Sequence, residues 1–288
     1  MSKEQKFDIN KLKDNAFKYF GLMCTFFGLI ILSIFLINIL VEGLPRLNWQ
    51  FFTSLPSRKP ENAGIFIPIF GSIWIMVLTA LIAVPIGIAS GIFLEEYGKK
   101  NRFASFIEIN ISNLAGVPSI IYGLLALEIF VRIMGLGKSL LAGSLTLSLL
   151  ILPIIIVSTR EAIKAVPKSI REASYALGGT RWQTIWFQVL PAASGGLLTG
   201  VILAVSRAIG ESAPLIVIGA MLYVTNLPTG PMSDFTVMPI QIFNWLGRPQ
   251  KGFIENATAA IIILLLITFM MNGIAIYLRN KWQKKVKW

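Results

Sequence analysis

The most restrictive feature of this sequence is a set of long runs that contain no charged residue. A helix needs about 20 apolar residues to cross the hydrocarbon core of a bilayer, and lipid offers no partner to unpaired backbone groups. Charged residues make up only 14% of the chain, against about 25% in soluble domains. We therefore predict an all-α integral membrane protein. Five runs of 19 to 33 residues lie between Lys18 and Glu42, Glu61 and Glu95, Glu108 and Glu128, Lys138 and Arg160, and Glu255 and Arg279.

A sixth helix is predicted between Arg181 and Asp234, where the only charged residues are Arg207 and Glu211. The first part of this stretch, "WQTIWFQVLP", is amphipathic and is expected to form an interfacial helix that ends at Pro191. The span that follows is expected to bend near Pro214, because proline removes a helix hydrogen bond. The six predicted membrane helices are 20–41, 65–94, 113–131, 140–158, 194–223 and 257–278.

The distribution of basic residues predicts the orientation of these helices. With the amino terminus inside the cell, 18 of the 26 lysines and arginines fall in cytoplasmic segments and 7 in external ones. Such an excess on the cytoplasmic side is the usual pattern in membrane proteins. Both termini are therefore expected in the cytoplasm. Topology and anionic lipid headgroups account for the net charge of +12, so no nucleic-acid partner is expected.

The segments outside the predicted helices divide the chain further. Residues 1–19 are expected to form a cytoplasmic amphipathic segment, of which residues 8–19, with apolar side chains near helical spacing, lie along the inner membrane surface. Two connections are long, namely the cytoplasmic loop 159–193 and the external segment 224–256, and long connections are usually functional when ordered. Residues 279–288 form a basic cytoplasmic tail. The core of the protein is expected to be 65–278.

The cytoplasmic loop contains the stretch "REASYALGGTRWQTIWFQVLP", residues 171–191. It resembles the cytoplasmic signature of binding-protein-dependent ABC importer permeases, which is Glu-Ala-Ala, three residues, Gly, nine residues, Ile, one residue, Leu-Pro. Ser174 replaces the second Ala and Gln188 replaces the Ile. The resemblance implies that the loop couples the chain to an ATP-binding cassette ATPase subunit. The residues that match the signature are Glu172, Ala173, Gly178, Leu190 and Pro191.

Residue types alone predict a helix–turn–helix in this loop. A short helix is expected to begin at 169–172, to break at Gly178 and Gly179, and to restart at Thr180, because a glycine pair is a natural turn between helices. One side of this unit is expected to dock in a groove on a partner, and the alternative is a solvated loop with no partner. The apolar residues on that side are Ala176, Leu177 and Ile185.

Three further stretches narrow the resemblance. They are "NLAGVPSIIYG" at 113–123, "AVSRAIGESAPL" at 204–215 and "FTVMPIQIFNW" at 235–245, and they are similar to the PstA-type permeases of phosphate ABC importers. The resemblance extends from about residue 65 to the end. It implies a type I importer permease fold with six spans in the cell membrane. It also implies three partners: the ATPase subunits, a second homologous permease subunit of PstC type, and an extracytoplasmic phosphate-binding protein.

Arg207 and Glu211 are charged residues in an otherwise apolar stretch. A continuous helix would place Arg207 about 24 Å from Pro191 and from Tyr223, near the membrane midplane. Because an arginine there costs at least about 2.5 kcal/mol against lipid, we expect it to face the bundle interior or a water-filled path.

Two interpretations of this pair remain open. A guanidinium fork matches phosphate oxygens, so Arg207 is a candidate substrate ligand. Glu211 would hold Arg207 when the path is empty and would accept a hydrogen bond from a protonated phosphate oxygen, which sulfate lacks at neutral pH. The alternative is a structural ion pair between two helices.

Enzymatic chemistry is not expected. The chain has no histidine and its carboxylates are scattered, so neither a metal site nor a hydrolytic triad can be assembled, and no cofactor is predicted. The stretch "GLGKS" at 135–139 lacks the first glycine of a nucleotide-binding loop, because Arg132 occupies that position. A partner must therefore hydrolyse ATP. The rival functions are an importer permease for another oxyanion, such as phosphonate or sulfate, and a passive anion channel or membrane scaffold.

Overall fold

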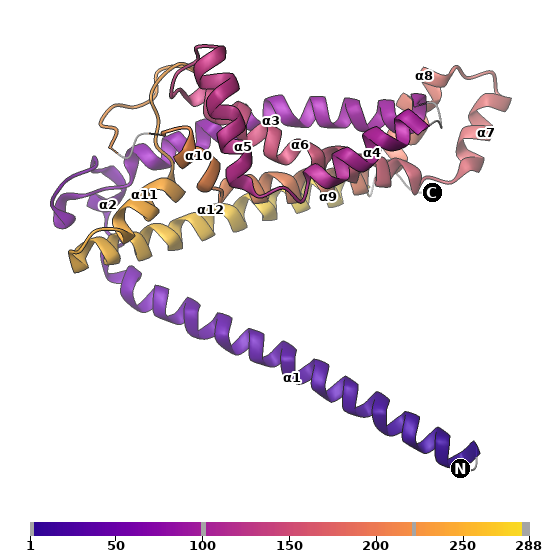
Figure 1. Cartoon of the computed structure of the whole chain (residues 1–288), viewed down its shortest axis with the longest axis horizontal. Helices are drawn as coiled ribbons and strands as arrows, with labels where there is room; N and C mark the ends of the chain where they lie inside the picture. Colours follow the sequence, from indigo (N-terminus) through magenta and orange to yellow (C-terminus); the bar gives the residue numbers. More distant parts are fainter. Residues whose placement is uncertain (1–2, 99–101, 221–222, 284–288) are drawn as a thin grey trace.

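The computed structural model describes residues 3–98, 102–220 and 223–283, and the regular structure in these ranges is helical except for one isolated bridge between Ser139 and Asp234. Figure 1 shows an elongated bundle with α7 and α8 at one end, here called the α7 end, and α2 and α11 at the other, the α11 end. The helices are α1 (Lys3–Gly43), α2 (Trp49–Thr53), α3 (Phe66–Ile92), α4 (Arg102–Leu114), α5 (Ser119–Ala126), α6 (Leu140–Lys164), α7 (Lys168–Ala176), α8 (Arg181–Thr184), α9 (Leu190–Ile209), α10 (Ala213–Val217), α11 (Met238–Leu246) and α12 (Lys251–Gln283).

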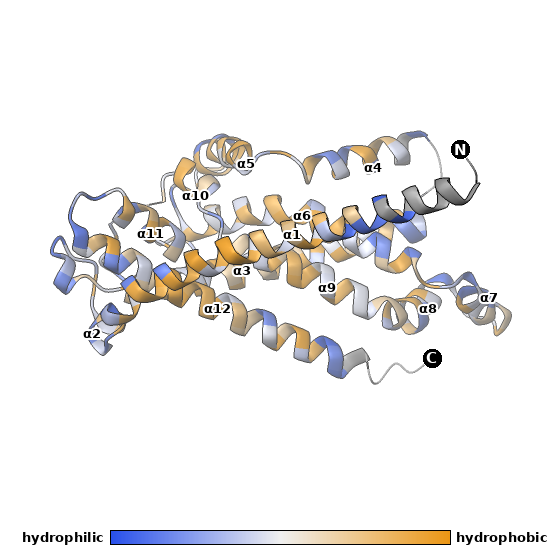
Figure 2. Cartoon of the chain, turned by 90° about the horizontal axis from the view of Figure 1, so that it is seen from below, coloured by the Kyte–Doolittle hydropathy of each residue, from blue (hydrophilic) through white to orange (hydrophobic). Residues whose placement is uncertain are grey.

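Five of the helical segments are long and apolar enough to cross a membrane, and a bent pair of segments raises the number to six in the part of the chain that the structure describes. Figure 2 shows hydrophobic residues along the middle of the long helices and hydrophilic residues gathered at the two ends. This agrees with the prediction of a six-span, all-α membrane protein. The five unbroken segments are Lys13–Arg46, Phe66–Tyr97, Leu140–Lys164, Arg181–Ile209 and Lys251–Lys281.

The core of the bundle is α6, which packs between α3 and α9. Small residues allow both approaches. A Cβ added to Gly91 of α3 would lie 2.6 Å from Thr159 Cβ, and one added to Gly196 of α9 would lie 2.7 Å from Ala162 Cβ. Both contacts are closer than carbon atoms tolerate, so larger residues at these positions would push the helices apart.

The first helix lies largely outside this core. α1 diverges from the bundle (Figure 1), and its side chains are exposed along most of its length. Only its last turns touch α12, where Gly43 lies against the backbone of Ala259. The expectation of a separate surface segment over residues 1–19 is wrong for the residues described, because α1 runs without a break from Lys3 through the predicted span 20–41.

The predicted span 113–131 is not one helix. α4 ends at Leu114, α5 begins at Ser119, and the segments on the two sides of this break meet at 102°. Pro118 causes the break, because it has no amide hydrogen and disfavours a helical conformation in the residue before it. Tyr122 donates its hydroxyl to the Leu114 carbonyl at 2.8 Å, which satisfies one of the carbonyls left free where α4 ends.

The predicted span 194–223 is also wrong in its bounds. α8, a π-helical turn (Ile185–Val189) and α9 follow one another without interruption, so the helix passes through Pro191 instead of ending there. Pro191 is tolerated because it lies in the first turn of α9, where the π turn has already changed the hydrogen-bonding pattern. The helix ends at Ile209, and Pro214 lies in the first turn of α10, where its missing amide hydrogen is not needed.

The α11 end is organised around an arginine. Arg46 donates to Asn256 Oδ1 at 2.6 Å and to the carbonyls of Pro60, Glu61 and Ala63. Asn256 is fully buried. Beneath this cluster Phe51 packs on Trp245 of α11, with ring centroids 5.9 Å apart. The arginine therefore fastens the start of α12 to the connection between α1 and α3.

We predict that Arg46→Ala destabilises the protein, because it removes the partner of a buried amide. A buried polar group without a partner costs about 1–3 kcal/mol, so the midpoint of thermal unfolding in detergent should fall. Arg132→Ala is the control, since Arg132 forms an ion pair with Glu128 in which both side chains are more than half exposed. Equal midpoints for the two variants would show that the Arg46 cluster contributes nothing to stability.

Candidate translocation and coupling sites

Arg207 and Glu211 lie on the two sides of the point where α9 ends. Arg207 Nε and Glu211 Oε1 are 3.6 Å apart, and the side chains are 42% and 19% exposed. In the described part of the chain no hydrogen bond reaches the guanidinium. The pair is therefore within electrostatic range, while the fork of Arg207 keeps its donors available.

Arg207 does not lie at the midpoint of a long helix, where it was expected. That position required a helix from Pro191 to Tyr223, whereas α9 ends at Ile209. Arg207 is instead in the last turn of α9, where the unpaired carbonyls of a helix favour a positive charge. Its neighbour Ser206 hydrogen-bonds Asn272 of α12, so this end of α9 is held against α12.

The two helix breaks are close to each other. A Cβ on Gly123 of α5 would lie 2.7 Å from Pro214 Cα of α10, so glycine is what lets the two short helices touch. Tyr122, Ala208 and Leu215 belong to the same buried cluster. The stretches 113–123 and 204–215, which are far apart in the sequence, thus form one structural unit beside Arg207 and Glu211. Figure 1 shows α5 and α10 side by side.

This arrangement can bind an anion. Irregular backbone at membrane depth is tolerated where protein buries it or where it lines a water-filled cavity, and paired discontinuous helices are how many transporters build substrate sites. Here two such breaks pack together beside one arginine that pairs with Glu211 at 3.6 Å and makes no hydrogen bond within the described residues. The sequence indicated the pair and a bend near Pro214 but not the break at Pro118, because a charge-free run shows the length of a segment and not its direction.

The helix–turn–helix predicted for the loop at the α7 end is confirmed. α7 is followed by Gly178, whose φ is +83°, a conformation that favours glycine, and Thr180 caps α8 in a capping box with Gln183. A Cβ on Gly179 would lie 2.8 Å from Ser174 Oγ. Both glycines are therefore required, the first for its backbone angle and the second for a close approach.

The signature residues divide into exposed and anchored ones. Glu172 and Ala173 are exposed on α7, and Leu177 is 90% exposed. Leu190 and Pro191 are partly buried, and Leu190 packs against the cluster of Ile163, Val166, Val189, Ala193 and Leu197.

Ile185 was expected on the docking side together with Ala176 and Leu177, and this is wrong for Ile185. Its side chain is fully buried, because the π turn that it begins packs against α7. Ala176 and Leu177 are exposed as expected. The exposed apolar surface of the loop is therefore the end of α7 and the turn that follows it.

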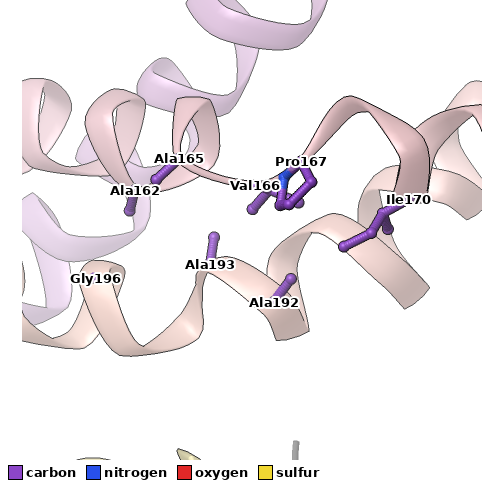
Figure 3. Close-up of a pocket in the computed structure, with 8 residues that line it drawn as sticks. All are labelled: Ala162, Ala165, Val166, Pro167, Ile170, Ala192, Ala193 and Gly196. Atoms are coloured by element: carbon purple, nitrogen blue, oxygen red, sulfur yellow. The ribbon is translucent and has the colours of Figure 1, made fainter. Parts of the chain in front are cut away.

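Two hollows adjoin this loop. One, of about 400 Å³, is lined by residues that include Ala173, Leu177 and both signature departures, Ser174 and Gln188. Ser174 also hydrogen-bonds the Thr184 hydroxyl at 2.8 Å, so the substituted hydroxyl links α7 to α8. The other, of about 440 Å³, lies between the end of α6 and the start of α9 (Figure 3) and is lined by Ala162, Ala165, Val166, Pro167, Ile170, Ala192, Ala193 and Gly196.

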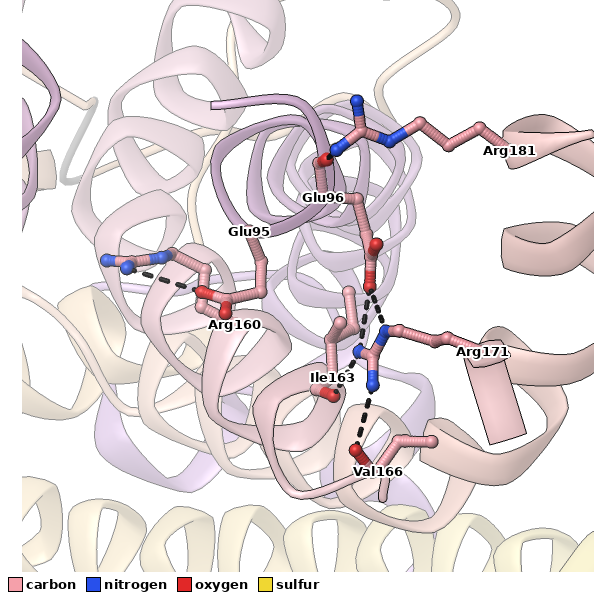
Figure 4. A network of polar contacts seen from close by, with 7 residues as sticks. All are labelled: Glu95, Glu96, Arg160, Ile163, Val166, Arg171 and Arg181. Carbon is pink, nitrogen blue, oxygen red and sulfur yellow. Dashed lines mark hydrogen bonds and ion pairs between the residues drawn. The ribbon is translucent and has the colours of Figure 1, made fainter. Parts of the chain in front are cut away.

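A network of charges that the sequence analysis missed holds the loop to the bundle (Figure 4). Arg171 donates to Glu96 Oε1 at 2.8 and 3.1 Å, and Arg181 donates to the backbone carbonyl of Glu96. Arg160 pairs with Glu95 at 3.4 Å and with Glu108 at 2.9 Å. The signal was present as two adjacent glutamates at the end of an apolar run, but their partners are 65 or more positions away in the sequence. Within the described residues, no group of three His, Cys, Asp or Glu side chains is placed to hold a metal ion.

Residues 83–284 match the family model of "Binding-protein-dependent transport system inner membrane component". The chain is 32% identical over 271 residues to a probable ABC transporter permease of Bacillus subtilis, YqgI, covering 87% of this chain and 90% of the relative. It is 30% identical to the phosphate transport system permease PstA of Pasteurella multocida (92% and 94% covered) and 32% identical to that of Mycobacterium leprae (89% and 86% covered).

Solved structures with the same fold include importer subunits. A chain from a bacterial ABC transporter involved in the import of alginate aligns with a TM-score of 0.68 at 16% identity, covering 94% of this chain and 98% of that one. A chain of the MetNI methionine ABC transporter in an inward-facing conformation aligns with a TM-score of 0.57 at 17% identity, covering 76% and 97%. At this identity the likeness concerns the fold.

We predict that Gly178→Pro disorders the loop, because proline fixes φ near −65° and removes the amide that donates to the Tyr175 carbonyl at 2.9 Å. Hydrogen–deuterium exchange of the amides in α7 and α8 should rise. Gly135→Pro is the matched control, since Gly135 has a φ of +65° and lies outside the loop. Exchange that is the same in both variants would contradict a structural requirement for Gly178.

Proposed function

Because the chain belongs to the family of binding-protein-dependent transport system inner membrane components, we propose that it is a permease subunit of an ATP-driven importer of inorganic phosphate. Support for the substrate comes from relatives named phosphate transport system permeases, at 30–33% identity over 85–92% of this chain. The observation that carries the proposal is a guanidinium at the junction of two broken helices that makes no hydrogen bond to the described residues.

The proposed site works through complementary charge. The fork of Arg207 binds two phosphate oxygens in a bidentate arrangement, which is stronger and more directional than a point charge provides. Glu211 accepts the hydroxyl hydrogen of a protonated phosphate. Sulfate carries no such hydrogen at neutral pH, so Glu211 favours phosphate over sulfate. When the site is empty, Glu211 pairs with Arg207 and offsets the cost of an unpaired charge.

Membership of the family supports three kinds of partner in this proposal. An ATP-binding cassette subunit docks on the exposed part of the α7–α8 loop and hydrolyses ATP, so this chain has no catalytic role. A second permease subunit, of PstC type, completes the path. An extracytoplasmic phosphate-binding protein meets the α11 end, where α11 and the segment before it lie. The α7 end faces the cytoplasm and both termini lie on that side of the cell membrane, in the alternating-access scheme of transporters built from broken helices.

We predict that Arg207→Gln lowers phosphate uptake by reconstituted complex about tenfold or more, since it removes a charge-assisted hydrogen bond to the substrate. Arg132→Gln is the matched control, because Arg132 makes an ion pair of the same i,i+4 spacing with Glu128 outside the proposed site. Sulfate and phosphonate are included as competitors. Uptake without ATP would indicate a passive channel and not an importer.

The double variant Arg207→Gln with Glu211→Gln separates a substrate ligand from a structural ion pair. Removing both charges relieves the unpaired carboxylate left by the single variant. We expect the double variant to regain the thermal stability of the wild type and to remain inactive in uptake. Wild-type uptake by the double variant would reject the role of Arg207 in phosphate binding.

A further inference from the structure

Glu96 connects the α7–α8 loop to the helix bundle. It lies in the π-helical turn (Phe93–Tyr97) that ends α3, and its side chain is only 8% exposed. Its carboxylate accepts two hydrogen bonds from Arg171, which belongs to α7. Its backbone carbonyl accepts one from Arg181, the first residue of α8. One residue of the turn that ends α3 thus holds both helices of the loop.

The two arginines are fixed from other directions as well. Arg171 also donates to two backbone carbonyls. One is that of Ile163 in the last turn of α6, at 3.0 Å, and the other is that of Val166 just after α6, at 2.8 Å. The guanidinium of Arg181 lies over the ring of Tyr97 at 4.9 Å. Figure 4 shows Glu96 between the two arginines, with Glu95 directed to Arg160 instead. The loop is therefore clamped to α3 and α6 at once.

We propose that Glu96 is a positioning residue that makes the α7–α8 loop and α3 move as one body, so that movement of the loop reaches the substrate path. This inference rests on the proposed function, because it assumes that a partner ATPase moves the loop. The route continues through packed helices. α3 packs on α6 and α9, and all three contribute to the buried cluster that contains Tyr122 and Ala208 beside the helix breaks.

The contacts of Glu96 with Arg171 and Arg181, here called the clamp, are suited to coupling the movement of the loop to α3. Two donors of Arg171, Nε and a terminal nitrogen, converge on Oε1 of the buried Glu96 carboxylate. Charge-assisted hydrogen bonds of this kind are short and strong, so displacement of α7 displaces Glu96 with it. Glu95, one residue earlier, is 23% exposed and, among the described residues, pairs with Arg160 of α6. It belongs to the same charge network, and none of its contacts within the described part of the chain reaches the loop, which makes it a matched control.

The test compares Glu96→Gln with Glu95→Gln in the reconstituted complex with its ATPase, second permease and binding protein. Phosphate transported and ATP hydrolysed are measured in the same vesicles. We expect Glu96→Gln to lower the ratio of phosphate to ATP by roughly fivefold or more, the lower end of usual coupling between sites. Glu95→Gln should keep the wild-type ratio. A purely structural role would lower both rates together and leave the ratio unchanged, which would overturn the proposal.

Two further measurements test the inference even if the Glu96→Gln complex does not assemble or if phosphate is not the substrate. Where Glu96→Gln does not assemble, Arg171→Lys serves instead. Lysine keeps the charge but cannot reach Glu96 and two carbonyls together. A wild-type ratio of phosphate transported to ATP hydrolysed in that variant would also overturn the proposal. Hydrogen–deuterium exchange of α7 in the complex should rise in Glu96→Gln and not in Glu95→Gln. If the wild-type complex moves no phosphate, the proposed function fails, and the exchange result still decides whether the clamp exists.

Discussion

The structure depends on the requirement that every backbone polar group within the membrane finds a partner in the protein. Unbroken helices meet it along their length, but this chain interrupts two helices, at Ala115–Pro118 and at Gly210–Ser212. The Tyr122 hydroxyl satisfies the Leu114 carbonyl, and the close approach of Gly123 to Pro214 buries the two short helices against each other. The breaks are stable because they lie against each other, and the Arg207–Glu211 pair lies beside them.

Much of the fold could be predicted because hydropathy and charge report on environment. The charge-free runs indicated the membrane helices, and the Gly178–Gly179 pair indicated the turn between α7 and α8. The same runs concealed the 102° bend between α4 and α5, since apolar residues before and after Pro118 look alike whether or not the helix is straight. At Pro191 the error was the opposite one. A helix was expected to end there, but a π turn before the proline allows the helix to continue.

The candidate sites show a similar division. Arg207 and Glu211 could be found because charge is rare in that stretch, and their spacing of four residues indicated proximity. Glu96 could not be paired with Arg171 from the sequence, since 75 positions separate them and many basic residues were available. Ile185 was placed on the wrong side because its environment depends on how the π turn meets α7. Long-range pairing and local helix irregularity thus mark the limit of what the sequence predicts here.

The proposed function requires that an anion passes the junction of the two broken helices. Ser212 lies one residue beyond Glu211 and is partly exposed, and the only cysteine of the chain is Cys24. The most direct measurement is the rate at which a membrane-impermeant thiol reagent modifies the Ser212→Cys variant in a Cys24→Ser background, within the assembled complex. We expect modification that phosphate slows and sulfate does not. A thiol that never reacts, or that reacts at the same rate with and without phosphate, would contradict the claim.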